Sequence, residues 1–262
     1  MVIKSFRKSL KKILKMILKN KFTQPLYQKL YIQLGEFKAK SGYHNNQIQK
    51  FEHMLLKHGY SINNFKKILE FGCGYGRLIS SIDNLFPNAQ CYGSDIVKST
   101  LDIAKRNNLN INYIENSLNP PFPCEDEKFD LIYTFGVFTH LNEKSHIEWL
   151  EELSRKLKPG GICLHSIHTL ECLKLMNRFS PESINKYAIP KPVDEFISSL
   201  KSYYYTDKNK QTLRFGLSII PENYVRENWP KYSSLELIDV EIGAIQTYPE
   251  GCHDLVMLKK SI

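Results

Sequence analysis

A short glycine-rich segment, Glu70-Phe71-Gly72-Cys73-Gly74-Tyr75-Gly76, separates an apolar run typical of a strand from a run with helical periodicity. A glycine-rich turn of this kind brings backbone N–H groups and the positive end of a helix close to a ligand. Many nucleotide-binding proteins share such a turn. The segment therefore predicts a ligand-binding loop without identifying the ligand.

Three features near this loop disfavour a dinucleotide. The dinucleotide fingerprint G-x-G-x-x-G needs a small residue at position 77, but this chain has Arg77 and the spacing G-x-G-x-G. Glu70 stands two residues before the first glycine, where a carboxylate would repel a pyrophosphate and attract the cationic end of an amino acid. Asp95 ends the next predicted strand, where a carboxylate can accept both hydroxyls of a ribose.

Four histidines are candidates for a general base. His140 follows the fourth predicted strand, His165 lies inside the fifth, His168 follows it, and His253 begins the last. Ligands of open α/β sheets bind at the carboxyl ends of the strands, so His140 and His168 are the predicted catalytic residues. We expect His253 to reach the site only if its hairpin leans over it. A second interpretation of His140, that it only closes the turn before a helix, stays open.

No metal site is predicted. His165 and His168 are three positions apart, which on a strand places them on opposite faces, and no other ligand cluster stands out. The six cysteines are scattered without a C-x-x-C pair, which favours a chain with reduced thiols in the cytoplasm.

Helical and strand-like patterns alternate along most of the chain. The predicted helices are 44–58, 77–85, 99–107, 143–157 and 222–228, and the predicted strands are 67–71, 90–94, 110–114, 129–135, 161–167, 235–245 and 253–259. The alternation predicts right-handed βαβ crossovers and a parallel sheet with helices on both faces. A short connection at 247–251 makes the last two strands antiparallel.

The net charge of +9 is concentrated in the first 40 residues, which hold eleven Lys or Arg and one acidic residue. Residues 41–262 hold 25 basic and 26 acidic residues, which disfavours nucleic acid as a partner. Apolar residues recur at helical spacing among the lysines of residues 1–19 and predict a basic amphipathic helix. Two roles remain for this helix. It contacts the inner face of a membrane peripherally, or it packs on protein.

Residues 169–212 interrupt the alternation. They contain three prolines and the run Tyr203-Tyr204-Tyr205, and predict a partly helical insertion over one edge of the sheet. As a lid, this segment would offer rings to a sugar or base, and Lys208, Lys210 and Arg214 would offer cations to phosphates. The alternative is a solvated helix end with aromatic anchors in the core. We divide the chain into a leader, 1–40, and one domain, 41–262.

The run Ile68–Gly76 resembles the first motif of class I S-adenosylmethionine (AdoMet)-dependent methyltransferases. The resemblance covers about residues 65–168 and includes Gly93-Ser94-Asp95-Ile96, Phe129-Asp130-Leu131-Ile132 and Leu157-Lys158-Pro159-Gly160-Gly161. It implies a Rossmann-like α/β fold, with a seven-stranded, mostly parallel sheet whose last strand is antiparallel. It also implies AdoMet as the methyl donor, for which the protein aligns a nucleophile and removes its proton.

The resemblance further implies which residues contact the cofactor. The implied contacts are Glu70, Gly72 and Gly74 at the methionine moiety, Gly76 and Arg77 in the same loop, Asp95 at the ribose, Ile96, Asn116, Ser117 and Leu118 around the adenine, and Phe135 beside the methionine. Many relatives have an acidic residue near position 116, so Asn116 departs from the family pattern.

Three C-terminal segments, Leu217–Val225, Glu241–Ile245 and His253–Val256, resemble the tail of bacterial methyltransferases of capsular and surface-polysaccharide biosynthesis. That resemblance implies O-methylation of a small acceptor, a sugar or nucleotide sugar. Relatives often carry Gln where this chain has His253. An amine or phosphate-linked acceptor, or a nicotinamide-dependent oxidoreductase, remains the alternative.

Overall fold

In a computed structural model of the chain, residues 45–179, 181–207, 216–246 and 252–262 are described. The predicted leader, 1–40, and the predicted connection, 247–251, lie outside the described residues, as do the three cations Lys208, Lys210 and Arg214.

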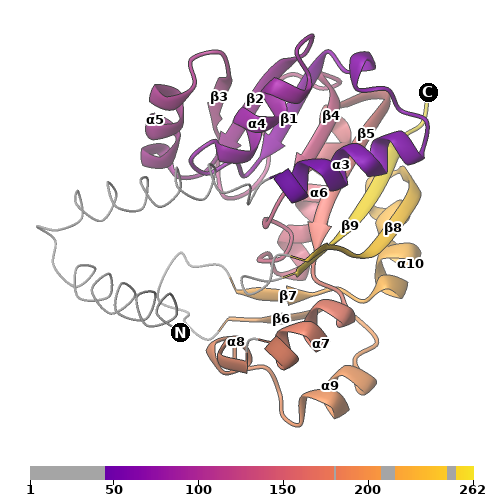
Figure 1. The fold of residues 1–262 in the computed structure, drawn as a ribbon. Helices are drawn as coiled ribbons and strands as arrows, with labels where there is room; N and C mark the ends of the chain where they lie inside the picture. Colours follow the sequence, from indigo (N-terminus) through magenta and orange to yellow (C-terminus); the bar gives the residue numbers. More distant parts are fainter. Residues whose placement is uncertain (1–44, 180, 208–215, 247–251) are drawn as a thin grey trace, which may run out of the picture. The chain divides into compact units, whose positions relative to one another are not determined.

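Seven strands form one sheet in the order β3-β2-β1-β4-β5-β9-β8 (Figure 1). Their bounds are β1 Lys67–Phe71, β2 Gln90–Asp95, β3 Asn112–Glu115, β4 Phe129–Thr134, β5 Leu157–Ile167, β8 Leu235–Gln246 and β9 Cys252–Lys260. The pairs among β1 to β5 are parallel, whereas β9 runs antiparallel to both β5 and β8. The predicted Rossmann-like sheet with an antiparallel last strand is confirmed.

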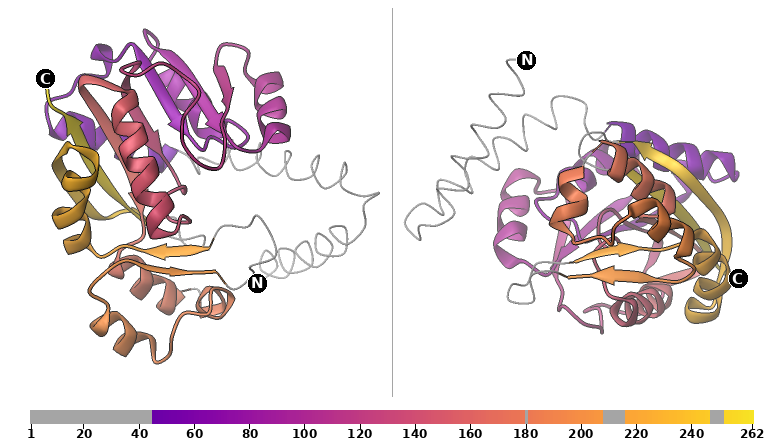
Figure 2. Two further views of the ribbon diagram at one scale, coloured as in Figure 1. Left: turned by 180° about the vertical axis from the view of Figure 1, so that it is seen from behind. Right: turned by 90° about the horizontal axis from the view of Figure 1, so that it is seen from below.

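Helices cover both faces of this sheet (Figures 1 and 2). Their bounds are α3 Asn45–Lys57, α4 Arg77–Leu85, α5 Lys98–Asn107, α6 Glu143–Lys156 and α10 Glu222–Ser233, with a 3-10 turn at Ile62–Asn64. The apolar residues of α3, α4 and α5 share one core with one face of the sheet, and those of α6 and α10 share another core with the opposite face. In β1, Ile68 joins the first core and Leu69 the second, so both faces of the strand are buried.

Helix α10 is longer than the predicted 222–228, because it continues through Pro230 to Ser233. Proline lacks the N–H that would bond to the preceding turn, and this usually ends a helix. Here Trp229 is fully buried, and the Pro230 carbonyl accepts the backbone N–H of Ser234 at 3.1 Å. Tertiary packing therefore outweighs the local preference of the proline.

The segment after β5 forms a small unit of helices and a two-stranded sheet. Its elements are α7 Leu170–Phe179, α8 Pro181–Lys186, α9 Val193–Ser199, β6 Tyr204–Thr206 and β7 Leu217–Ile219, and β6 pairs antiparallel with β7. The prediction placed this segment over one edge of the sheet. The structure attaches it at the carboxyl ends of β4 and β5, where Ser218 N–H donates to the Thr139 carbonyl at 2.9 Å and Ile220 N–H to the His168 carbonyl at 2.8 Å.

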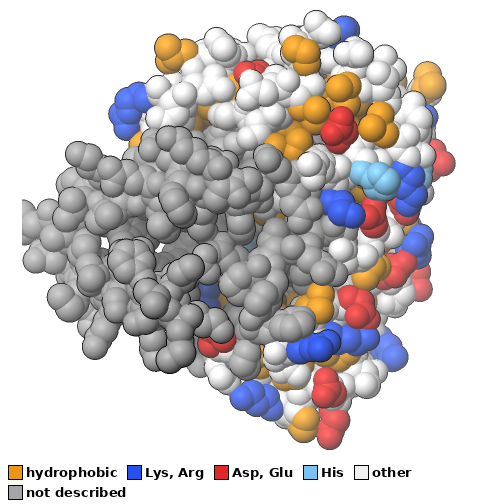
Figure 3. Space-filling model, in the orientation of Figure 1, with side chains coloured by type: hydrophobic (Ala, Val, Ile, Leu, Met, Phe, Trp, Pro, Cys, Tyr) orange, Lys and Arg blue, Asp and Glu red, His pale blue; other side chains and the backbone are white. Residues whose placement is uncertain are grey.

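Acidic and basic side chains are interspersed on the face shown in Figure 3. Among the described residues, no helix combines the length and the apolar character needed to cross a membrane.

Candidate active site

The glycine-rich loop is held between β2 and β4. Gly72 has a φ of 83°, which favours glycine, and a Cβ placed on it would lie 2.2 Å from Cγ2 of Val137. The Gly72 and Cys73 N–H groups donate to the Ser94 carbonyl at 2.8 and 2.7 Å. The Gly74 N–H donates to Oδ2 of Asp95 at 2.8 Å. The loop therefore has a fixed path along the carboxyl end of the sheet.

A cavity of about 150 Å³ opens beside this loop. It is lined by Phe71, Gly72, Asp95, Ile96, Asn116, Leu118, Gly136, Val137, His140, Leu141 and Trp149. The structure thus brings together six of the predicted site residues, namely Gly72, Asp95, Ile96, Asn116, Leu118 and His140. The other five lining residues come from the end of β1, the loop after β4 and helix α6, and sequence reasoning missed them.

Polar atoms in this cavity fit the nucleoside part of AdoMet. Asp95 is oriented by two backbone N–H groups, from Gly74 and from Val97 at 2.9 Å, and its carboxylate oxygens have further lone pairs for ribose hydroxyls. Asn116 is 5 % exposed; its side-chain N–H donates to the Ser117 carbonyl at 2.9 Å, while its Oδ1 has no partner. That buried acceptor suits the exocyclic amine of an adenine, which is the role an acidic residue would otherwise have.

Glu70 does not line the cavity. Its side chain is 3 % exposed and accepts a hydrogen bond at 3.1 Å from the Tyr133 hydroxyl on β4. Burial raises the pKa of Glu70 to about 8, whereas the hydrogen bond from Tyr133 lowers it. A cationic amino group bound nearby would lower the pKa of Glu70 again. The predicted contact between Glu70 and the methionine moiety stays a prediction.

Five other predicted cofactor residues also lie outside the cavity lining, namely Gly74, Gly76, Arg77, Ser117 and Phe135. Gly76 caps α4 with a φ of 72°, and Arg77 is the first residue of that helix. Phe135 packs against His253 instead, with ring centroids 4.3 Å apart.

Trp149 connects α6 to the cavity. Its indole N–H donates to the Leu118 carbonyl at 3.0 Å, and its ring centroid lies 4.5 Å from that of Phe71. The sequence gave no sign that Trp149 lines the cavity, because an aromatic residue on the apolar face of a helix is usually a core residue.

Replacing Trp149 with Phe should weaken AdoMet binding about fivefold, since a lost hydrogen bond is worth about 1 kcal/mol. Isothermal titration calorimetry measures this change. Trp229→Phe is the matched control, because Trp229 is fully buried in the same core and does not line the cavity. Trp229→Phe should lower the melting temperature of the protein and leave its AdoMet affinity unchanged. Equal AdoMet affinities of wild type, Trp149→Phe and Trp229→Phe would contradict the role of Trp149.

Three histidines gather where β4 and β5 end and β9 begins. His140 follows β4 and His168 follows β5. Because β9 is antiparallel, Ile167 is paired with Asp254, so the backbone places His253 next to His168, with ring centroids 4.9 Å apart. The strand register alone thus brings His253 beside His168, and whether His253 reaches the acceptor stays a prediction.

His140 has a defined orientation. Its Nδ1 lies 2.7 Å from the Gly216 carbonyl oxygen, which can only accept, so Nδ1 carries the proton and Nε2 is the basic nitrogen. Burial lowers the pKa of His140, while the Gly216 carbonyl acts in the opposite direction.

His165 faces away from this group, as expected from its position within a strand. Its ring centroid lies 4.6 Å from that of Phe138 and 5.9 Å from that of Trp229, in the core beneath α6. Within the described ranges, no three His, Cys, Asp or Glu side chains are arranged to hold a metal ion.

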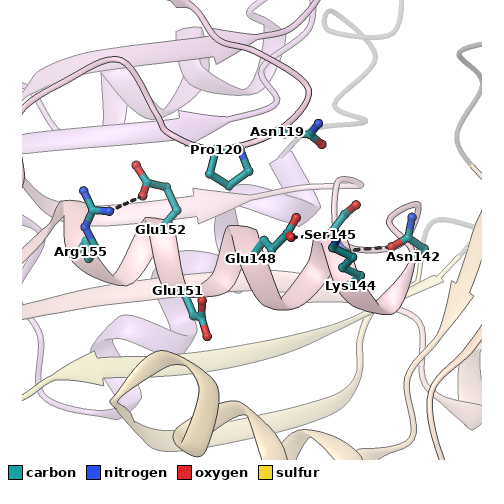
Figure 4. A pocket seen from close by; sticks show the side chains of 9 residues that line it. All are labelled: Asn119, Pro120, Asn142, Lys144, Ser145, Glu148, Glu151, Glu152 and Arg155. Atoms are coloured by element: carbon teal, nitrogen blue, oxygen red, sulfur yellow. Dashed lines mark hydrogen bonds and ion pairs between the residues drawn. The ribbon is translucent and has the colours of Figure 1, made fainter.

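A larger cavity, of about 520 Å³, lies along α6 (Figure 4). Its side chains are engaged with one another: Glu152 pairs with Arg155 at 3.1 Å, and the Ser145 N–H donates to Asn142 at 2.9 Å. Buried Glu152 also accepts the Phe122 N–H at 2.8 Å. These contacts fasten the loop after β3, which carries Asn116 and Leu118, and so support the cofactor cavity.

Comparison with known proteins identifies the family of this domain. Residues 68–161 match a family model described as a methyltransferase domain. A malonyl-[acyl-carrier protein] O-methyltransferase of Bacillus anthracis is 33 % identical over 131 residues, which cover 46 % of this chain and 45 % of the relative. A demethylmenaquinone methyltransferase of Staphylococcus saprophyticus is 27 % identical over 163 residues, covering 57 % and 68 %. The chain spans about half the length of most of the curated relatives it matches.

Solved structures share the fold. An S-adenosylmethionine-dependent methyltransferase from Mesorhizobium loti aligns with a TM-score of 0.57 at 15 % identity, covering 79 % of this chain and 96 % of that one. A Burkholderia thailandensis 1,6-didemethyltoxoflavin-N1-methyltransferase, solved with S-adenosylhomocysteine, aligns with a TM-score of 0.55 at 13 % identity, covering 90 % of each chain. Residues 68–161 form a class I AdoMet-dependent methyltransferase domain, and the predicted fold and methyl donor are confirmed.

Proposed function

We propose that this protein, built around an AdoMet-dependent methyltransferase domain, transfers a methyl group to a hydroxyl oxygen of a sugar or nucleotide sugar, with His140 as the general base. The observation that carries the proposal is the 2.7 Å contact between Nδ1 of His140 and the Gly216 carbonyl. It directs the basic Nε2 away from that carbonyl, in a side chain that also lines the cofactor cavity.

Beyond a general base, methyl transfer from AdoMet to a hydroxyl requires little from the side chains of the protein. Bound AdoMet supplies an electrophilic methyl group on a sulfonium. A neutral hydroxyl must lose its proton as the new bond forms, and a histidine with a lowered pKa is neutral and basic at pH 7. His140 would accept that proton at Nε2, and the Gly216 carbonyl would stabilise the resulting imidazolium.

Two further observations support an oxygen acceptor and a sugar. The Bacillus anthracis relative is named an O-methyltransferase. The C-terminal segments resemble methyltransferases of surface-polysaccharide biosynthesis, and the segment with the tyrosine run packs beside His140. There the Tyr203 hydroxyl donates to the Leu141 carbonyl at 2.9 Å, and the Gly216 N–H donates to the Tyr205 hydroxyl at 3.3 Å.

A second candidate acceptor is the carboxylate of an acyl group on a carrier protein, since several relatives are named for that substrate. A carboxylate is already deprotonated at neutral pH and needs no general base. A histidine held in one tautomer therefore favours the hydroxyl.

The test is a screen of acceptors with the full-length protein and AdoMet. Nucleotide sugars, methyl glycosides and a malonyl thioester are each incubated, and S-adenosylhomocysteine and the methylated product are detected by mass spectrometry. We expect a methylated sugar. A methylated malonyl thioester, together with unmodified sugars, would overturn the proposal.

The proposal extends to location: the reaction takes place in the cytoplasm, and residues 1–19 contact the inner face of an anionic membrane. It rests on the sequence pattern of those residues. Deletion of residues 1–22 should abolish sedimentation with anionic vesicles, and unchanged sedimentation would contradict the membrane contact.

A further inference from the structure

The cofactor cavity is small for the cofactor of this domain. Its volume of about 150 Å³ is about half of the lower end of the range usual for small-molecule sites, about 300–1,000 Å³. AdoMet consists of a nucleoside half and a methionine half that meet at the sulfonium. In this arrangement of the chain, the cavity has room for only one of the two halves.

The order of the strands shows which half the cavity can hold. Four residues of its lining each end or follow one of four neighbouring strands, taken in the order β3, β2, β1 and β4, namely Asn116, Asp95, Gly72 and Val137 (Figure 1). Adjacent strands lie about 4.8 Å apart, so these residues form a row along the carboxyl edge of the sheet. With the adenine at Asn116 and the ribose at Asp95, the methionine half must extend over the glycine loop and toward the end of β4.

A methyl group of Val137 fills the space over the first glycine of the loop. A Cβ placed on Gly72 would lie 2.2 Å from Cγ2 of Val137. A glycine usually leaves such space for the close approach of a ligand to the backbone. Glu70 and Gly74, two further predicted contacts of the methionine moiety, do not line the cavity. The methionine half of the site is therefore covered, whereas the nucleoside half is open.

Val137 lies between a fixed residue and a residue at which the chain can turn. Phe138, the next residue, is fully buried among three rings of the core. Gly136, the residue before, has a φ of 72°, and a Cβ placed on it would have no atom within 4 Å. The Gly136 N–H donates to Oγ of Ser166 on β5 at 2.9 Å, which holds the backbone in this arrangement. Rotation at Gly136 can therefore displace Val137 while Phe138 stays in the core.

We propose that Gly136 and Val137 form a gate over the methionine half of the cofactor site. The nucleoside half is preformed. The methionine half opens when Gly136 turns, its hydrogen bond to Ser166 breaks and the Val137 side chain leaves the glycine loop. Opening the gate uses part of the binding free energy, so AdoMet binds more weakly than it would bind to an open site. This gate belongs to the methyltransferase domain and does not depend on the identity of the acceptor.

Two ligands that share the nucleoside test the gate without turnover. S-Adenosylhomocysteine and 5′-deoxy-5′-methylthioadenosine both contain the nucleoside and the sulfur, but only the first carries the amino-acid part. Isothermal titration calorimetry with the full-length protein compares them. Val137→Ala should tighten the binding of S-adenosylhomocysteine about tenfold, because a larger fraction of the protein is then open. The affinity for methylthioadenosine should stay at its wild-type value.

Ser166→Ala tests the turn at Gly136 without changing a wall of the cavity. Ser166 is fully buried and does not line the cavity, so its loss removes no contact with either ligand. Without the hydrogen bond to the Gly136 N–H, the covered arrangement is less stable. Binding of S-adenosylhomocysteine should tighten about fivefold, as expected for one hydrogen bond, and binding of methylthioadenosine should not change.

The matched control is Val225→Ala. Val225 is fully buried in the core against which Val137 packs, and it does not line the cavity. Val225→Ala should lower the melting temperature and keep the wild-type ratio of the two affinities.

Three results would overturn the gate. They are an equal change for both ligands in Val137→Ala, wild-type affinities in both gate variants, and a wild-type protein that does not bind methylthioadenosine. The last result would show that the nucleoside half is not preformed. Because no acceptor is present, failure of the sugar screen leaves the gate standing, and failure of the gate leaves the sugar proposal standing.

Discussion

Lowering the pH from 7.5 to 5 should destabilise the ligand-free protein. Burial lowers the pKa of five histidines, and lowers that of two of them, His165 and His253, to about 3; the other three are His140, His146 and His168. Their stabilisation is complete above the unfolded pKa near 6.5 and is lost as the pH falls, because only the unfolded chain can take up the protons. His165 and His253 each contribute about 2 kcal/mol of the loss at pH 5, and the other three histidines act in the same direction.

Glu70 opposes this loss. Its pKa is raised to about 8, so the folded protein holds its proton more tightly than the unfolded chain does. Between pH 7.5 and 5 this offsets about 3 kcal/mol of the loss from the histidines. That is a large part of the 5–15 kcal/mol by which domains are usually stable.

Urea denaturation at the two pH values measures the effect, and two variants should move it in opposite directions. His165→Phe removes one titrating group and should reduce the loss by about 2 kcal/mol, while Glu70→Gln should increase it by about 3 kcal/mol. His53→Gln, at the surface, should match wild type. An unchanged pH dependence in both core variants would contradict the proposed cause.

The second large effect is on catalysis. His140→Gln should lower kcat at least 100-fold with the acceptor found in the screen, because the amide cannot take the proton from a hydroxyl. AdoMet affinity should change only slightly, since Asp95, Ile96 and Asn116 surround the nucleoside part of the cavity.

The pH profile adds a readout that a structural role of His140 would not give. A base works when neutral, so kcat/KM of wild type should rise through the lowered pKa of His140, below 6.5, and stay level from pH 7 to 8. The His140→Gln variant should lack this acidic limb. Wild-type turnover in the variant, or an identical limb, would refute the assignment and leave His140 as a residue that only closes a turn.

Local features made the cofactor side predictable. The glycine loop, the strand before it and Asp95 lie within one βαβ unit, and each has a pattern that short-range rules describe. The order of the strands placed His140 and His168 at the carboxyl edge for the same reason.

Features that depend on packing or on backbone atoms could not be predicted from the sequence. The pairing of β6 with β7 joins segments on either side of 208–215, and the carbonyls of Gly216 and Ser218 have no signature in residue type. Trp149 reaches the cavity only because α6 crosses the end of β1. The alternation of β1 did contain a clue: it places Phe71, rather than Glu70, on the face that lines the cavity.

Strand β9 lies between β5 and β8, although it follows both in the chain. During synthesis, residues up to 246 can be complete while the edge of β5 is still unpaired and exposed, a state prone to pairing with other chains. His253, which packs against Phe135 and His168, also takes its place only when residues 252–260 insert. An assay on nascent chains should therefore detect cofactor binding before acceptor turnover, and a protein released before this insertion would bind AdoMet without methylating anything.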